Sequence, residues 1–115
     1  MKIETKNLSG APLAWACVKA LGGDADGWVD VAHKVLWFSR GWAAGGPVIE
    51  SYRISVLPIA PSKLLARNGE WEASMPASGV WLRGATPLEA AMRSLVQSKL
   101  GPEIEIPEAV CALKP

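Results

Sequence analysis

The spacing of hydrophobic residues predicts an amphipathic helix near the start of the chain. Its apolar stripe recurs at 3, 1, 3 and 1 spacing, as expected for one face of an α-helix: Leu13, Ala16, Cys17, Ala20 and Leu21. Ser9 can cap the start of this helix, and Pro12 suits the first turn, where its missing N–H costs little. Gly22 and Gly23 end it.

A second helix is predicted from Pro87 to Leu100. Thr86 is placed as N-cap, Pro87 as the first helical residue and Glu89 as the third position of a capping box. One face is apolar: Leu88, Ala91, Met92, Leu95, Val96 and Leu100. Lys99 suits the negative end of the helix dipole, and Gly101-Pro102 stops the helix.

Between the helices, the pattern favours strands. Residues 28–37 alternate between apolar and polar, which predicts a half-buried strand, and residues 52–57 predict another. Asn68-Gly69 between residues 63–67 and 70–75 is typical of a β-hairpin, because both residues accept a positive φ. The predicted fold is therefore α+β: an antiparallel sheet of about four strands with two helices packed on one face.

The two ends of the chain complete this prediction. Residues 103–106 alternate and predict an edge strand around Ile104. From Glu108 onward we expect a weak helical turn or a loose tail. No domain linker is apparent, so residues 1–115 are predicted to form a single domain.

The segment from Trp37 to Pro47 is rich in both aromatic residues and glycine. Its Gly45-Gly46-Pro47 run is unfavourable inside a helix or a central strand, so residues 38–47 are predicted to form a loop. Trp37 is assigned to the end of the preceding strand and to the core. Trp42 is placed on the loop, where binding groups tend to collect.

Composition narrows the class of protein. The 115 residues are half hydrophobic and carry a formal net charge of +1, which gives no electrostatic footprint for DNA. No apolar run approaches the ~18 residues of a membrane span, and residues 1–6 contain no apolar signal core, so a cytoplasmic protein is expected. Two cysteines cannot form a disulfide framework, and Cys17 is assigned to the core.

Candidate catalytic and metal-binding groups are weak. One cluster gathers possible ligands within ten residues, but it lacks the later positions of a calcium loop and is interpreted as a solvated turn: Asp24, Asp26, Asp30 and His33. Cys17 and His33 would pair only by accident of folding, and Glu70 with Glu72 fits a solvent-facing charged edge. No phosphate-loop or dinucleotide fingerprint is present. We expect no catalytic residue, cofactor or metal.

Tryptophan and arginine residues are the remaining candidates for a binding site. The chain has six Trp against one Phe and one Tyr, and aromatic stacking with arginine forks is how proteins hold nucleotides. Core tryptophans and solvated arginines are the alternative interpretation. The candidate ligand-binding residues are Arg40, Trp42, Gly45, Gly46, Arg53, Trp81, Arg83 and Arg93.

Three blocks of the sequence resemble the NinX-like proteins of phages and prophages. They lie at residues 1–16, at residues 42–50 and at residues 86–101, whereas residues 58–80 match little. Members often have Ser-Thr-Asp before the central Trp, where this chain has Ser39-Arg40-Gly41. The resemblance implies a phage accessory protein in the bacterial cytoplasm and supplies no catalytic residues.

Three functions compete at this point. The first is a binding module that antagonises host defence by sequestering a small nucleotide-type signalling ligand. The second is a regulatory factor that binds a host or phage protein through an apolar patch around Trp42. The third, a hydrolase of small nucleotides, has the least support, since the chain has one histidine. The edge strand at Ile104 and exposed aromatics would suit a homo-oligomer.

Overall fold

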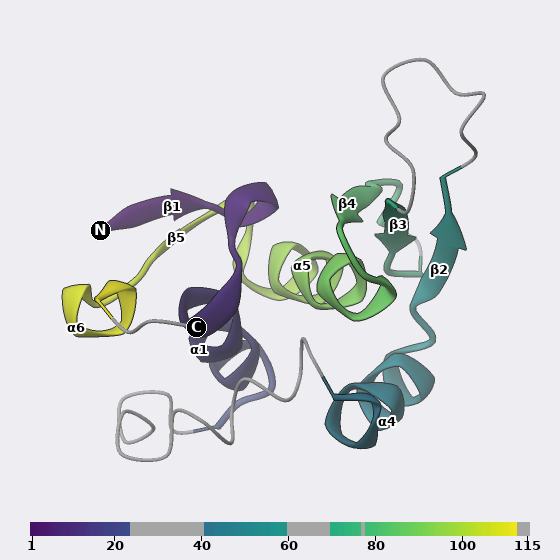
Figure 1. The fold of residues 1–115 in the computed structure, drawn as a ribbon, viewed down its shortest axis with the longest axis horizontal. Helices are drawn as coiled ribbons and strands as arrows, with labels where there is room; N and C mark the ends of the chain where they lie inside the picture. Colours follow the sequence, from purple (N-terminus) through teal and green to yellow (C-terminus); the bar gives the residue numbers. More distant parts are fainter. Residues whose placement is uncertain (24–40, 60–69, 77, 113–115) are drawn as a thin grey trace.

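The computed structural model describes residues 1–23, 41–59, 70–76 and 78–112 (Figure 1). In chain order the elements are β1 (Lys2–Glu4), the 3-10 turn η1 (Thr5–Asn7), α1 (Gly10–Ala20), α4 (Trp42–Tyr52), β2 (Ser55–Pro58), β3 (Trp71–Ser74), β4 (Leu82–Gly84), α5 (Pro87–Leu100), β5 (Glu103–Glu105) and α6 (Glu108–Cys111). The predicted α+β class with antiparallel strands and packed helices is confirmed.

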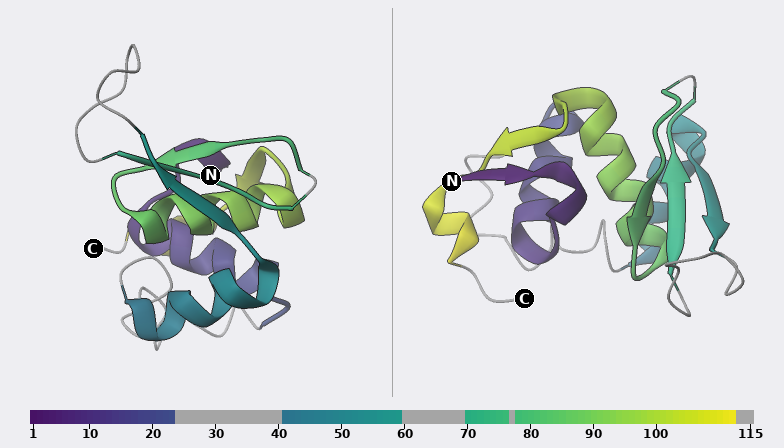
Figure 2. Two further views of the ribbon diagram at one scale, coloured as in Figure 1. Left: turned by 90° about the vertical axis from the view of Figure 1, so that its right-hand side faces the viewer. Right: turned by 90° about the horizontal axis from the view of Figure 1, so that it is seen from above.

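The described strands form two antiparallel sheets. In the larger sheet β3 lies between β2 and β4, and the register aligns Val56 with Ala73 and Ala73 with Leu82. Ala73 and Leu82 are buried, so this face of the sheet packs on the core. Figure 2 shows helix α5 against that face. The opposite face carries the exposed side chains of Leu57 and Arg83.

Helix α5 is the central element of the fold. It packs against α1, α4 and all three strands of the larger sheet (Figure 1). The predicted apolar face is confirmed, since Leu88 and Leu95 are buried and Leu100 packs against the core with part of its surface exposed. Most of the core therefore forms around this helix.

Both ends of α5 follow the sequence prediction. Thr86 Oγ1 accepts a hydrogen bond from the Glu89 N–H at 3.1 Å. The Glu89 carboxylate accepts from the N–H of Ala85, one residue before the N-cap, at 3.1 Å. At the other end Gly101 has a φ of 97° and donates its N–H to the Gln97 carbonyl. These local bonds satisfy main-chain groups that the helix leaves unpaired.

Helix α1 is also confirmed. Leu13 and Cys17 are fully buried, and Trp15 is only 3% exposed, so this indole widens the buried face. Ser9 occupies the N-cap position, but its side chain makes no capping hydrogen bond. Burial raises the pKa of the Cys17 thiol, because the thiolate would lose its hydration.

The prediction of a loop through Gly45-Gly46-Pro47 is wrong, since these residues lie inside α4. Pro47 removes only the hydrogen bond that would reach the Ala43 carbonyl, and the Gly45 N–H still bonds to Gly41 at 2.9 Å. Gly46 lacks the Cβ that normally clashes with a following proline ring, so it can keep a helical backbone. Packing of α4 against α5 then favours the helix.

The chain ends contain one pairing that the sequence pattern did not predict. The expected strand near Ile104 is present as β5, and its partner is β1, with Ile3 opposite Ile104. The expectation of a loose tail is corrected for residues 108–112, because α6 packs against α1 with Val110 fully buried. Residues 113–115 lie outside the described part.

Several predictions fall on residues outside the described ranges. They are the strand at 28–37, the acidic and histidine cluster at 24–33, and the first strand and turn of the hairpin at 63–69. The strand predicted at residues 70–75 is confirmed as β3, but its neighbours in the sheet are β2 and β4 rather than the strand predicted at residues 63–67. The predicted strand at 52–57 begins at Ser55 instead, because α4 continues to Tyr52.

Gly84 gives a test of the packing between β4 and α5. A Cβ at this position would lie 2.5 Å from the main-chain nitrogen of Ala90, so the strand and the helix would have to separate. We expect Gly84→Ala to lower the free energy of unfolding by about 1–3 kcal/mol or more. Urea denaturation measures this, with Ser55→Ala at an exposed strand position as control. Equal stability of both variants would contradict the described packing.

The two cysteines should differ in reactivity. Cys17 is buried with a raised thiol pKa, whereas Cys111 is partly exposed. In the native protein a thiol reagent should therefore modify Cys111 quickly and Cys17 only after unfolding. Rapid modification of both thiols in the native protein would contradict this expectation.

The raised pKa of the Cys17 thiol also means that stability falls as the pH rises above about 8.5, because only the unfolded chain then ionises at Cys17.

Candidate ligand-binding site

A depression of about 300 Å³ lies between η1 and β4. Lys6 and Asn7 line it from η1, Arg93 lines it from α5, and Trp81, Leu82 and Arg83 line it from the β4 segment. Its described lining thus contains three basic residues, one indole and no acidic residue. Such a surface favours an anionic ligand that carries a flat ring.

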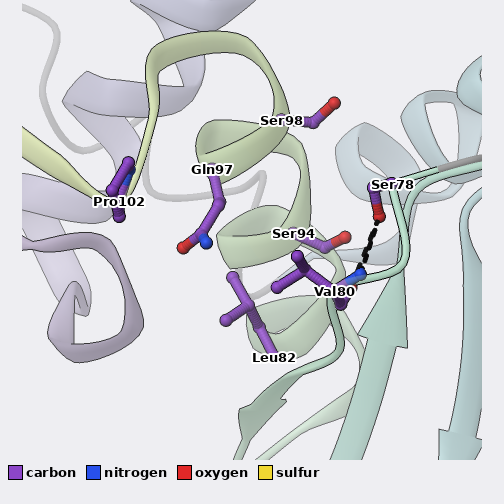
Figure 3. Close-up of a pocket in the computed structure, with 7 residues that line it drawn as sticks. All are labelled: Ser78, Val80, Leu82, Ser94, Gln97, Ser98 and Pro102. Atoms are coloured by element: carbon purple, nitrogen blue, oxygen red, sulfur yellow. Dashed lines mark hydrogen bonds between the residues drawn. The ribbon is translucent and has the colours of Figure 1, made fainter.

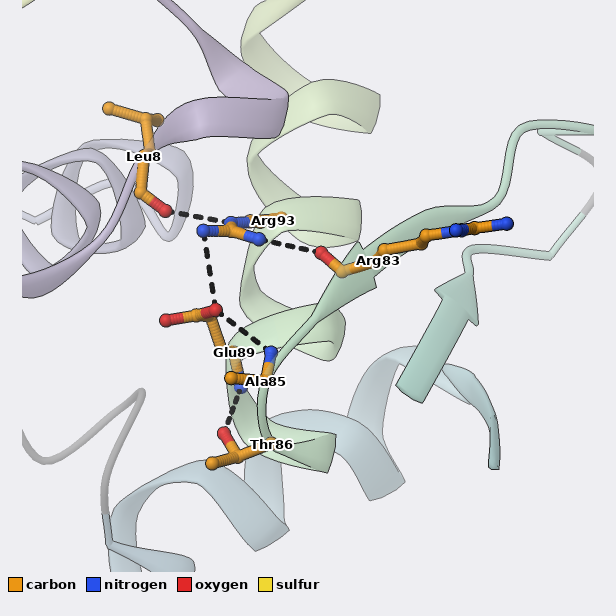
Figure 4. A network of polar contacts seen from close by, with 6 residues as sticks. All are labelled: Leu8, Arg83, Ala85, Thr86, Glu89 and Arg93. Carbon is orange, nitrogen blue, oxygen red and sulfur yellow. Dashed lines mark hydrogen bonds and ion pairs between the residues drawn. The ribbon is translucent and has the colours of Figure 1, made fainter. Parts of the chain in front are cut away.

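Arg93 forms the base of this depression and connects its two walls (Figure 4). Its Nε donates to the Leu8 carbonyl at 2.7 Å, and its Nη1 donates to the Arg83 carbonyl at 2.7 Å. Its Nη2 lies 3.2 Å from Glu89, and the arginine side chain is only 14% exposed. Most of its hydrogen-bonding capacity is therefore spent on holding the chain in place.

Lys6 and Trp81 are both exposed to solvent. The Lys6 ammonium pairs with Glu4 at 3.4 Å on the surface, a contact of small energy. Trp81 is 45% exposed, so a large part of its surface is accessible to a partner. These two side chains can contact a ligand without breaking an internal bond of the core.

Arg83 contributes mainly its backbone to this depression. Figure 4 shows its side chain directed away from Arg93, while its carbonyl accepts the Arg93 hydrogen bond. The guanidinium lies 3.9 Å from the Glu70 carboxylate. Glu70 and Arg83 also line an adjacent depression of about 240 Å³, in which the charges are mixed.

The other predicted site residues lie elsewhere. Trp42 is the first residue of α4 and is 59% exposed, and Gly45 and Gly46 belong to the same helix. Arg53 follows α4 in the left-handed region, with a φ of 53°. Arg40 lies outside the described residues. The structure therefore brings together Trp81, Arg83 and Arg93, and it separates them from the α4 set.

Lys6 and Asn7 were missed by sequence reasoning. They reach the site because Thr5 fixes η1 against the end of α5: its N–H bonds to the Pro102 carbonyl at 2.8 Å, and its hydroxyl bonds to the Gly101 carbonyl at 2.7 Å. Thr5 is fully buried. A buried threonine beside an exposed lysine has no distinctive pattern, so only the fold reveals this part of the site.

Comparison with known families identifies the chain. Residues 4–99 match the family model described as Bacteriophage P22, NinX. This protein belongs to the NinX family. The match includes every described residue that lines the depression, from Lys6 to Arg93, and leaves β5 and α6 beyond its end. No curated protein was found to match the chain.

Two negative findings apply to the part of this NinX-family chain that the structure describes. Within residues 1–23, 41–59, 70–76 and 78–112, no three His, Cys, Asp or Glu side chains are grouped to hold a metal ion. No helix in the same ranges is long and apolar enough to cross a bilayer. Of the two glutamates considered in the sequence, Glu70 precedes β3 and its carboxylate lies 3.9 Å from the Arg83 guanidinium.

Replacement of Arg93 should destabilise the protein. Arg93→Ala leaves the Leu8 and Arg83 carbonyls without their charged donor and Glu89 without its partner, so we expect a loss of about 2–4 kcal/mol in unfolding free energy. Lys6→Ala, which removes only an exposed pair, should change stability by less than about 1 kcal/mol. Denaturant titration compares them, and wild-type stability of Arg93→Ala would refute the bridging role.

Proposed function

We propose that this NinX-family protein is a phage accessory protein that binds a small nucleotide-type ligand and sequesters it from host defence without chemical turnover. The observation that carries the proposal is the depression beside β4, which combines the exposed indole of Trp81 with the cationic side chains of Lys6 and Arg93, each of which also pairs with a glutamate outside the described lining. Phosphate oxygens favour Lys and Arg as partners, and a base can stack on the indole of Trp81.

Arg93 and Lys6 differ in how firmly they are held, and this difference supports binding by a preformed site. Arg93 is fixed by bonds to both walls, so its positive charge is held in place before a ligand arrives. The Lys6 side chain is 65% exposed, so its ammonium is accessible to a phosphate. Because the Arg93 guanidinium is already held in place, fewer side chains have to be ordered when a ligand binds, and this reduces the entropy cost of binding.

Binding without turnover is the part of the proposal that concerns chemistry. Cys17 is fully buried and its thiol pKa is raised, so it is a poor nucleophile. The residues that line the depression are cations, an amide and apolar groups, none of which is placed here as an activated base. We therefore expect a bound nucleotide to be released intact.

Calorimetry with adenosine- and guanosine-containing nucleotides tests the proposal. We expect binding of at least one nucleotide, about tenfold or more weaker in Trp81→Ala and in Lys6→Ala, and unchanged in Lys2→Ala, an exposed lysine on β1. Denaturation of the complex should then return the nucleotide chemically unchanged. Absence of heat with every nucleotide, at tens of micromolar protein, would overturn the proposal.

A second function is favoured by α4. Trp42 is 59% exposed at the start of this helix and is not among the residues that line the depression, so it could contact a host or phage protein instead. Trp42→Ala should then abolish capture of that partner from host lysate and leave nucleotide binding unchanged. Trp81→Ala should give the reverse result. The two tryptophans thus distinguish the two functions.

A further inference from the structure

A second cavity, of about 320 Å³, lies beside the basic depression on the same helix (Figure 3). Its lining includes Ser94, Gln97 and Ser98 from α5 and the side chains of Val80 and Leu82 from the segment leading into β4. Pro102 lies at one end of it. The described lining contains no charged residue, in contrast to the depression beside it.

The two cavities are neighbours that share one lining residue. Leu82 lines both of them, and Arg93 and Gln97 lie one helical turn apart on α5, one in each cavity. The hydrogen bonds of Thr5 to Gly101 and Pro102 join η1, which walls the first cavity, to Pro102, which walls the second. We refer to the two neighbouring cavities together as the groove over α5: the β4 segment lines both cavities, η1 lines the first and Pro102 lines the second.

The chemistry of the neutral part suits a nucleoside. Val80, Leu82 and Pro102 supply apolar surface for a flat base, and the Gln97 amide carries both a donor and an acceptor. A glutamine amide can pair with the N6 and N7 edge of adenine in a bidentate manner. The hydroxyls of Ser94 and Ser98 can bond to the hydroxyls of a ribose.

We propose that the groove takes a dinucleotide, that is, two nucleosides joined through phosphate. One nucleoside and the phosphates occupy the part lined by Lys6, Trp81 and Arg93, and the second nucleoside occupies the part lined by Gln97 and the serines. The two cavities, of about 320 and 300 Å³, each lie near the lower end of the ~300–1,000 Å³ typical of ligand sites, so together they offer room for two nucleosides. This inference rests on the proposed nucleotide binding and specifies its ligand class.

Diadenosine pyrophosphate and adenosine monophosphate are the probes. Both carry about two negative charges at neutral pH, and the dinucleotide adds a second phosphate group and a second nucleoside. Calorimetry on the full chain should show the dinucleotide binding at least about tenfold more tightly than the mononucleotide. Gln97→Ala should weaken the dinucleotide about tenfold and leave the mononucleotide within about twofold, because Gln97 lines only the neutral cavity.

A filling variant provides an independent readout. Ser98 is exposed on α5, so Ser98→Trp should fold and fill the neutral cavity, which abolishes the advantage of the dinucleotide. Ser51→Trp, at an exposed position of α4, is the matched control and should retain it. Thermal unfolding of each variant verifies that it is folded.

The outcomes separate this inference from the proposed function. Binding of adenosine monophosphate as tightly as the dinucleotide, with no effect of Gln97→Ala or Ser98→Trp, would overturn the dinucleotide inference and leave nucleotide binding standing. Failure of every nucleotide to bind would overturn both. Selective loss of dinucleotide affinity in the two neutral-cavity variants is the result that supports the inference.

Discussion

The bridge that Arg93 makes across α5 is the interaction on which the rest of the structure depends. Its guanidinium holds the Leu8 carbonyl, the Arg83 carbonyl and the Glu89 carboxylate, which come from three separate parts of the chain. The planar fork of arginine matches this geometry, whereas lysine would present a single point of charge. The N-terminal segment, the edge of β4 and the start of α5 are thereby fixed relative to one another.

This bridge also links stability to the candidate site. Because Arg93 is the base of the basic depression, the same bonds that join the two walls also set their separation. Lys6 and Trp81 project from those walls and remain accessible. The candidate site therefore combines a guanidinium that is held in place with two exposed side chains, and the proposed ligand binding rests on this arrangement.

Helix α4 shows how packing can override a local preference. Gly45, Gly46 and Pro47 individually disfavour a helix, by about 1 kcal/mol for each glycine and more for proline. Here Gly46 relieves the clash with the proline ring, and contact with α5 compensates for the remaining cost. The outcome moves Trp42 from a predicted loop to the exposed first turn of a helix, away from the residues with which it had been grouped.

The sequence alone determined the elements whose signals are local. The capping box at Thr86 and the apolar stripes of α1 and α5 act within a few residues, so their prediction was confirmed. The sequence also predicted three residues of the depression, Trp81, Arg83 and Arg93, but it predicted all three as ligand contacts. Only the tertiary structure placed Lys6 beside Trp81, paired β1 with β5 and turned Arg93 into an internal bridge. Those relations join residues far apart in the chain, and they are set by the packing of the whole core rather than by any local pattern.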